Sequence, residues 1–145
     1  MDLSIPTPRL IPELCCADYN KSLSFYTDVL GFNIDYKREE EGFAMLEKEG
    51  AFLMIDLLHA GRTWTTGVME KPFGRGINLQ IEVEDVDALY ENVKKHNHPI
   101  FIEMEEKWYR ADDIYVGSRQ FLVQDPDGYL LRFYEDLGER KIPPP

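Results

Sequence analysis

The stretch that decides the fold runs from Leu10 to Phe32 and reads LIPELCCADYNKSLSFYTDVLGF. Residues 10–16 are predicted to form a strand, and Asp18 is a typical N-cap for the helix that follows. Gly31 stands where a glycine commonly ends a helix. Between these two positions, apolar side chains recur at helical spacing: Tyr19, Leu23, Tyr26 and Leu30. The stretch therefore predicts a strand followed directly by an amphipathic helix.

The same order occurs a second time, displaced by about 67 residues. Residues 77–83 alternate as a strand, and Asp85 caps a helix with its own apolar face: Val86, Leu89, Tyr90 and Val93. Each helix is followed by three strand-like segments, at 32–37, 43–47 and 52–58 in the first half, and at 99–104, 118–124 and 129–134 in the second. The turn Asp125-Pro-Asp-Gly128 precedes the last segment.

These patterns predict an α+β fold in which two βαβββ modules form a curved mixed sheet with a cleft, and the helices lie on the outer face. The chain has 145 residues, which suits one domain. We expect the first module at about 8–58, a connector at 59–76, the second module at 77–136 and a tail at 137–145. A second irregular stretch is expected at 105–117.

Composition narrows the class of partner. The chain carries 16 basic and 27 acidic residues, for a net charge of −11. This balance argues against nucleic acid and against anionic membrane surfaces, which both need clustered Lys and Arg. An acidic surface is compatible with a cationic ligand, although it often means only solubility.

Cellular location is inferred from what the sequence lacks. No apolar run approaches the length of a membrane span, and the first residues do not resemble a secretory signal. Cys15 and Cys16 are adjacent, so an ordinary disulfide between them is not expected. These features favour the cytoplasm. For Cys15 a buried core thiol is favoured over a thiol that faces the cleft.

Two charges interrupt apolar strand runs, Asp56 and Arg132. Such residues pair with each other, bind a ligand or face water, because a buried unpaired charge is costly. Alternation places Asn78 and Gln80 opposite the apolar face of their strand, and the 67-residue offset matches Gln80 to Glu13. Phe52 and Met54 share the face of Asp56.

Aromatic residues gather in the two stretches expected to be irregular. The connector holds Trp64, and residues 105–117 hold Trp108, Tyr109 and Tyr115. Flat side chains suit stacking on an aromatic ligand, and they equally suit packing of a loop on the sheet.

Two motifs give the chain a family resemblance. One consists of Ile11–Asp18, Ser22–Tyr26 and Val29–Phe32, and the other is Phe121–Phe133 with its Asp-Pro-Asp-Gly turn. Together they resemble the glyoxalase, bleomycin-resistance and extradiol-dioxygenase superfamily, also called vicinal oxygen chelate. The resemblance implies paired βαβββ modules, a cleft in a strongly curved sheet and, usually, a dimer.

The resemblance also implies where a metal would bind. The metal enzymes of the superfamily take one ligand from each of four strands, and the corresponding positions here are Ile11, Asp56, Asn78 and Arg132. Only Asp56 is a normal ligand, and transition-metal sites need about three strong donors. We therefore expect no metal and no cofactor.

Without these metal ligands, the sequence resembles the metal-free bleomycin-resistance branch of the superfamily. Members of this branch are non-catalytic homodimers that sequester a drug at the subunit interface. This resemblance implies a small-molecule ligand, aromatic and possibly cationic. Residues 4–9, with two prolines, are expected to form an arm exchanged between subunits. The expected binding residues are Glu13, Phe52, Met54, Asp56, Trp64, Asn78, Gln80, Trp108, Tyr109, Tyr115 and Arg132.

Two alternatives stay open. The first is an enzyme, either a lyase or isomerase with Asp56 as base and Arg132 as anion clamp, or a dioxygenase-like relative with relocated ligands. The second is a sensor or carrier of a metabolite, which would use the same binding residues.

Overall fold

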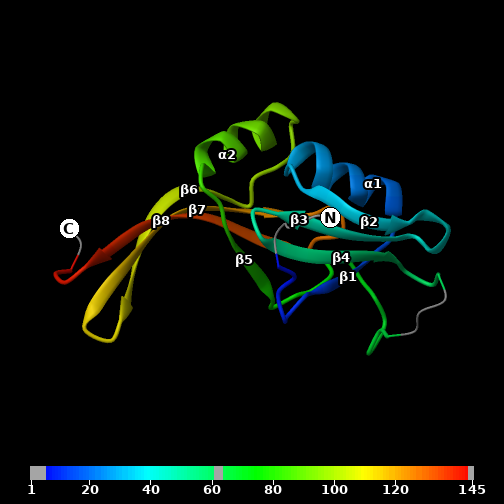
Figure 1. Cartoon of the computed structure of the whole chain (residues 1–145), viewed down its shortest axis with the longest axis horizontal. Helices are drawn as coiled ribbons and strands as arrows, with labels where there is room; N and C mark the ends of the chain where they lie inside the picture. The colour runs from blue at the N-terminus through cyan, green and yellow to red at the C-terminus, as the bar shows by residue number, and fades with distance from the viewer. Residues whose placement is uncertain (1–5, 61–63, 144–145) are drawn as a thin grey trace. The chain divides into compact units, whose positions relative to one another are not determined.

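The computed structural model describes residues 6–60 and 64–143, and within them the chain forms eight strands and two α-helices (Figure 1). The chain divides into two compact units. Unit 1 runs to Phe73 and also contains Asp125–Gly128, whereas unit 2 comprises Gly74–Gln124 and the chain from Tyr129 onward. No described helix has both the length and the apolar character needed to cross a membrane.

Unit 1 is built as the sequence predicts, with a strand, a helix and three more strands. Its sheet has the order β1-β4-β3-β2, in which β1 and β4 are parallel and the other pairs antiparallel. The bounds are β1 Glu13–Cys16, α1 Tyr19–Ser24, β2 Asn33–Arg38, β3 Phe43–Lys48 and β4 Ala51–Leu57, with a π-helical turn at Phe25–Val29 and a 3₁₀ turn at Glu39–Glu41.

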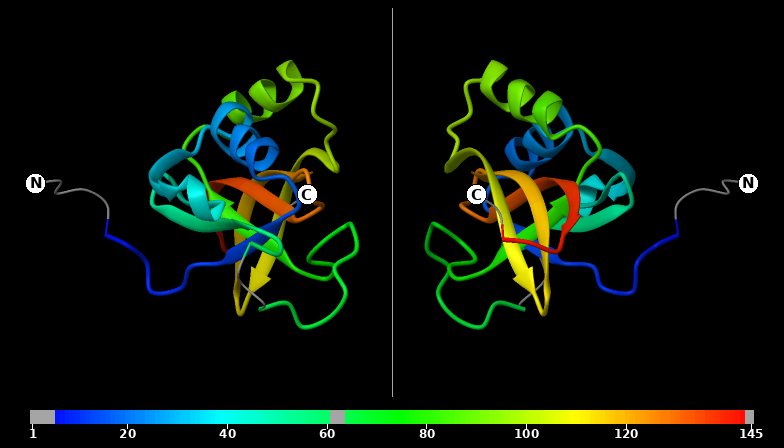
Figure 2. Two further views of the ribbon diagram at one scale, coloured as in Figure 1. Left: turned by 90° about the vertical axis from the view of Figure 1, so that its right-hand side faces the viewer. Right: turned by 90° about the vertical axis from the view of Figure 1, so that its left-hand side faces the viewer.

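The helix of unit 1 begins and ends where its sequence signals stand. The Asp18 carboxylate accepts a hydrogen bond from the Lys21 N–H at 3.1 Å, which satisfies an open donor of the first turn. Gly31 has a φ of +77°, a conformation that glycine adopts without steric cost. Tyr26 and Leu30 are fully buried. Burial of this apolar face holds α1 and the π-helical turn after it against one side of the sheet. No described α-helix of unit 1 lies on the opposite side, which we call the open face (Figure 2).

Unit 2 repeats this topology. Its sheet has the order β5-β8-β7-β6, with β5 parallel to β8, and Asp85 caps its helix by accepting from the Ala88 N–H at 3.0 Å. The bounds are β5 Asn78–Glu82, α2 Val86–Lys95, β6 Ile102–Ala111, β7 Ile114–Gln124 and β8 Leu130–Arg140. The prediction of two βαβββ modules is confirmed.

The prediction of an irregular stretch at 105–117 is wrong. These residues form most of a long β6–β7 hairpin, which turns at Asp112 and Asp113 and projects from the sheet of unit 2 (Figure 1). Along 105–111 no side chain is buried and polar residues stand on both faces of β6, so the sequence shows no apolar alternation there. The expected tail is also too long, because residues 137–140 continue β8.

The turn Asp125–Gly128, which joins β7 to β8, is part of unit 1. The Asp127 carboxylate, 2% exposed, accepts hydrogen bonds from the Ala17 N–H at 3.1 Å and from the Ser22 hydroxyl at 3.2 Å. The Tyr26 hydroxyl donates to Asp125 at 2.8 Å. A segment from the second half of the sequence thus anchors the start of α1.

The expected exchange arm lies partly outside the described residues, since Ser4 and Ile5 belong to the segment 1–5. Residues 6–12 form no helix or strand, and Leu10 in this segment is 84% exposed. Within the connector, residues 61–63 also lie outside the described part.

Candidate functional site

The open face of the unit 1 sheet, opposite α1, carries the first group of candidate residues. In the β1–β4 register Glu13 lies beside Met54, and Cys15 lies beside Asp56. Phe43 lies beside Asp56 on the next strand. Residues in register point to the same face of a sheet. Glu13, Cys15 and Asp56 therefore share one face.

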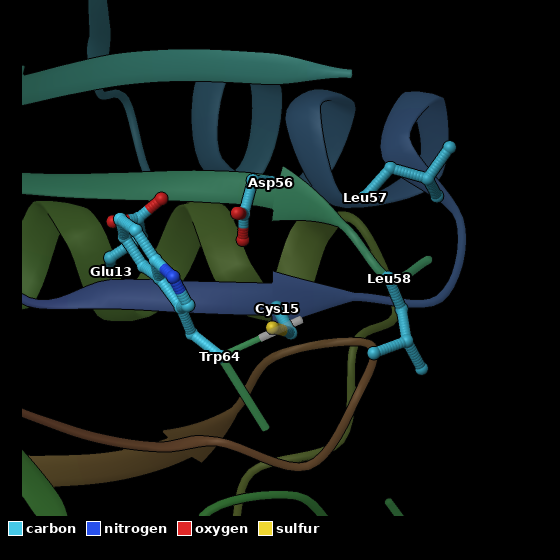
Figure 3. Close-up of a pocket in the computed structure, with 6 residues that line it drawn as sticks. All are labelled: Glu13, Cys15, Asp56, Leu57, Leu58 and Trp64. Carbon is cyan, nitrogen blue, oxygen red and sulfur yellow. The ribbon is translucent and has the colours of Figure 1, made fainter. Parts of the chain in front are cut away.

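At one end of this face the structure forms a pocket of about 150 Å³. Its lining consists of Glu13, Cys15, Asp56, Leu57, Leu58 and Trp64 (Figure 3). Asp56 is only 6% exposed, whereas Trp64 is 76% exposed and comes from the connector that follows β4. Three expected site residues, Glu13, Asp56 and Trp64, are thus brought together.

The pocket combines two carboxylates with an indole ring. A carboxylate attracts a cation, and an indole face binds the same cation through its quadrupole or stacks on a flat ring. The volume is below that of pockets which enclose a drug-sized molecule, so this pocket can hold one end of such a ligand. The arrangement suits a small aromatic or ammonium group.

Cys15 was expected in the core, and the structure corrects this. Cys15 is half-buried and lines the pocket, whereas Cys16 is 1% exposed and lies on the helix side, where its thiol donates to the Asp56 carbonyl at 3.4 Å. Burial, together with the nearby Asp127 and Asp56 carboxylates, raises the pKa of the Cys16 thiol to about 12. The missed residues Leu57 and Leu58 supply the apolar part of the lining.

Two further candidates on the same face belong to an apolar cluster. Phe52 is 7% exposed and packs with Phe43 and Met45, and Met54 is partly buried against them. The Arg38 guanidinium lies 4.1 Å from the centre of the Phe43 ring. This cluster forms an apolar surface beside Glu13 and Asp56.

The second group of candidates lies on one face of the unit 2 sheet. Gln80, Arg132 and Leu122 are register neighbours on β5, β8 and β7. The Arg132 guanidinium donates to the Gln80 side-chain oxygen. Asn78 shares this face of β5, because it stands two residues before Gln80.

The polar side chains beside this group are bonded to one another. The Gln120 amide donates to the Tyr109 hydroxyl at 2.7 Å and to a Glu105 oxygen at 3.1 Å. The Tyr134 hydroxyl donates to Glu82 at 3.3 Å. Tyr109 therefore belongs to the Arg132 face.

Trp108 and Tyr115 lie on the opposite face of the same hairpin. Trp108 stands beside Gly117 in the register, and a Cβ on this glycine would come within 2.6 Å of the indole ring. The Arg140 guanidinium carbon lies 5.0 Å from the centre of the Trp108 ring. Because adjacent residues of a strand point to opposite faces, a strand prediction for 105–111 would have placed Trp108 and Tyr109 on different faces of the sheet.

The metal-ligand positions can now be compared through the strand register. Met54 lies beside Glu13 as Arg132 lies beside Gln80, and the 67-residue offset equates Glu13 with Gln80. The internal repeat therefore equates Arg132 with Met54, not with Asp56. With either Asp56 or Met54 at the remaining position, the amide of Asn78, the guanidinium of Arg132 and the alkyl chain of Ile11 do not complete a transition-metal site. Within residues 6–60 and 64–143, no three His, Cys, Asp or Glu side chains are grouped to hold a metal ion.

The fold and the site together define the class of protein. The model of the Glyoxalase/Bleomycin resistance protein/Dioxygenase superfamily matches residues 10–133, and the chain belongs to this superfamily. The resemblance inferred from the sequence is confirmed.

Particular relatives are similar over nearly their whole length. The chain is 30% identical to a bleomycin resistance protein of Geobacillus stearothermophilus and to one of Staphylococcus aureus, with 88% of this chain and 96% of the relative covered in each case. Among solved structures, TioX from Micromonospora sp. ML1 shares the fold with a TM-score of 0.68 at 22% identity, covering 90% of this chain and 99% of TioX. A protein of unknown function from Agrobacterium tumefaciens has a TM-score of 0.64 at 29% identity, covering 94% and 95%.

Proposed function

We propose that this chain is a non-catalytic binding protein of bleomycin-resistance type, which sequesters an aromatic, cationic drug or metabolite. The observation that carries the proposal is the pocket in which Glu13 and Asp56 meet the Trp64 indole. A sequestering protein needs affinity and no reacting group, and two carboxylates beside an indole supply affinity for a cationic ring.

Three further features support this proposal. Relatives at 30% identity are named bleomycin resistance proteins. The net charge of −11 favours encounter with cations. The superfamily's metal-ligand positions lack a suitable donor set. We place the ligand's cationic end between Glu13 and Asp56, and its flat ring on Trp64.

We further propose that two chains form a homodimer, and that the drug-binding cleft is completed at their interface. A homodimer of this kind has a two-fold axis and two equivalent clefts. Sedimentation equilibrium of the full chain is expected to give twice the monomer mass. A monomer that still binds the ligand would contradict the interfacial cleft and leave the pocket proposal standing.

Isothermal titration calorimetry with bleomycin tests the binding function. We expect saturable binding by the native chain and a loss of about 1–2 kcal/mol in binding free energy for Trp64→Ala, because a stacked ring is removed. Glu13→Gln is expected to weaken binding by a similar amount through the loss of one carboxylate.

The matched control is Glu40→Gln, which removes the same charge from an exposed turn of unit 1. This variant is expected to bind as the native chain does. Equal weakening of bleomycin binding in Glu13→Gln and Glu40→Gln would show that the loss depends on net charge and not on the position of Glu13. Absence of binding to bleomycin, and to a panel of aromatic cations followed by thermal shift, would contradict the proposal.

A further inference from the structure

Arg132 stands on the inner strand β8, on the face of the unit 2 sheet that also carries Gln80 and Leu122, and the hydrogen bonding of its guanidinium is incomplete. Arg132 is half-buried, and its one side-chain partner among the described residues is the neutral amide oxygen of Gln80. Its Nε nitrogen is inaccessible to solvent and has no hydrogen-bond partner within the described chain. A guanidinium offers five N–H donors, so most of this group's capacity is unused.

The neighbouring carboxylates do not neutralise this charge. Glu82 accepts from the Tyr134 hydroxyl, and Glu105 accepts from the Gln120 amide. Arg132 forms no ion pair with any residue in 6–60 or 64–143, although the chain has 27 acidic residues. By contrast Arg119, on β7 of the same unit, holds Asp87 through two of its nitrogens at 2.8 and 3.2 Å.

The surroundings of Arg132 on this face are partly apolar. Leu122 lies beside it in the register and is 8% exposed, and Leu130 precedes it by two residues on the same face. A charge next to leucines is poorly solvated, and an opposite charge is therefore attracted to it more strongly than in water. The site thus combines the cationic hydrogen-bond donors of Arg132 with an apolar surface formed by Leu122 and Leu130.

From this geometry we infer that Arg132 is the anchor of a second ligand subsite, which takes the carboxylate of a small molecule with an apolar or aromatic body. A carboxylate offers two oxygens to the planar guanidinium. The apolar body then lies on Leu122 and Leu130. Gln80 is a positioning residue, because its oxygen holds the guanidinium beside β5.

This inference is separate from the cation pocket of unit 1, and either can fail alone. If both hold, the protein accepts a cationic ring in unit 1 and a carboxylate in unit 2.

The experiment uses benzoate as the probe and benzamide as its uncharged counterpart. We titrate each into the ¹⁵N-labelled full chain at constant ionic strength and follow the arginine Nε–Hε resonances by NMR. Benzoate is expected to shift the Arg132 resonance in a saturable way and benzamide to leave it unchanged. Inorganic phosphate in a third titration distinguishes a carboxylate site from a general oxyanion site, and equal or tighter phosphate binding would overturn the carboxylate assignment.

Variants complete the test. Arg132→Gln is expected to weaken benzoate binding at least about tenfold, as for loss of a charge-assisted bond. Gln80→Ala is expected to weaken it less and to broaden the Arg132 resonance, and Arg119→Gln, whose guanidinium already holds Asp87, is the matched control with no effect. Equal shifts with benzoate and benzamide, or unchanged affinity in a folded Arg132→Gln variant, would overturn the inference. The native-chain titration alone decides the question if that variant fails to fold.

Discussion

At the scale of single residues, two adjacent cysteines have opposite environments. Neighbouring side chains of a strand point to opposite faces, so Cys15 lines the pocket and Cys16 enters the core beneath α1. The raised pKa of Cys16, about 12, leaves about one thiolate in ten thousand at pH 8. The thiolate is the reactive form, so the two thiols are expected to differ in reactivity.

The prediction is that Ellman's reagent at pH 8 labels Cys15 and leaves Cys16 unmodified in the folded chain. Cys15→Ser is expected to abolish labelling, whereas Cys16→Ser should leave the rate of the remaining thiol unchanged. Denaturant should expose the second thiol, which serves as the control for total thiol content. Labelling of both thiols at one rate in the folded chain would contradict the assignment.

At the scale of elements, the β6–β7 hairpin shows what sequence patterns miss. Both helices carry a capping aspartate, a periodic apolar face and a termination signal, so they could be predicted. The hairpin has no buried face along 105–111, and its residues give no alternation to detect. Glu13 and Asp56 stand on strands whose alternation predicts which face of the sheet each side chain occupies. Trp64 stands on a connector without periodicity, so its position beside them could not be predicted from the sequence.

The packing of Trp108 on Gly117 gives a prediction for this hairpin. In Gly117→Ala the new methyl group would lie 2.6 Å from the indole ring, and displacement of the ring should cost about 1–3 kcal/mol of the unfolding free energy. Urea denaturation measures this change. In a Trp108→Ala background the cost should disappear, and Gly67→Ala, with open space around it, is the matched control. A Gly117→Ala cost that persists without Trp108 would point to backbone strain instead.

At the scale of the whole molecule, the two βαβββ modules have one topology and different open faces. Unit 1 presents Glu13 and Asp56, and unit 2 presents Arg132 with Gln80. An internal repeat fixes where side chains project, and the sequence at each position fixes their charge. The repeat was visible in the sequence through Asp18 and Asp85, but the insertion of the 125–128 turn into unit 1 was not, because no local pattern encodes a contact of such long range.

This insertion leads to a prediction about stability. Asp127→Ala removes the acceptor of the Ala17 N–H and of the Ser22 hydroxyl, both bonded to a buried carboxylate. We expect the unfolding free energy to fall by about 2–4 kcal/mol, since buried donors lose a charged partner. Asp136→Ala is the control, because its exposed carboxylate accepts, within the described part of the chain, only the Gly138 N–H. Similar losses in the two variants, measured by urea denaturation, would show that the turn does not support unit 1.

The same turn imposes an order on the folding of the chain during its synthesis. A ribosome releases the N-terminal residues first, and domains generally begin to fold as they emerge. Here Ala17 and Tyr26 have their hydrogen-bond acceptors in Asp127 and Asp125, about a hundred residues later in the chain. Until the ribosome has synthesised most of the second module, the Ala17 N–H and the Tyr26 hydroxyl of the first module can form hydrogen bonds only with water or other groups, not with these two carboxylates. The first module therefore reaches its full set of hydrogen bonds only when the 125–128 turn has been synthesised, late in translation.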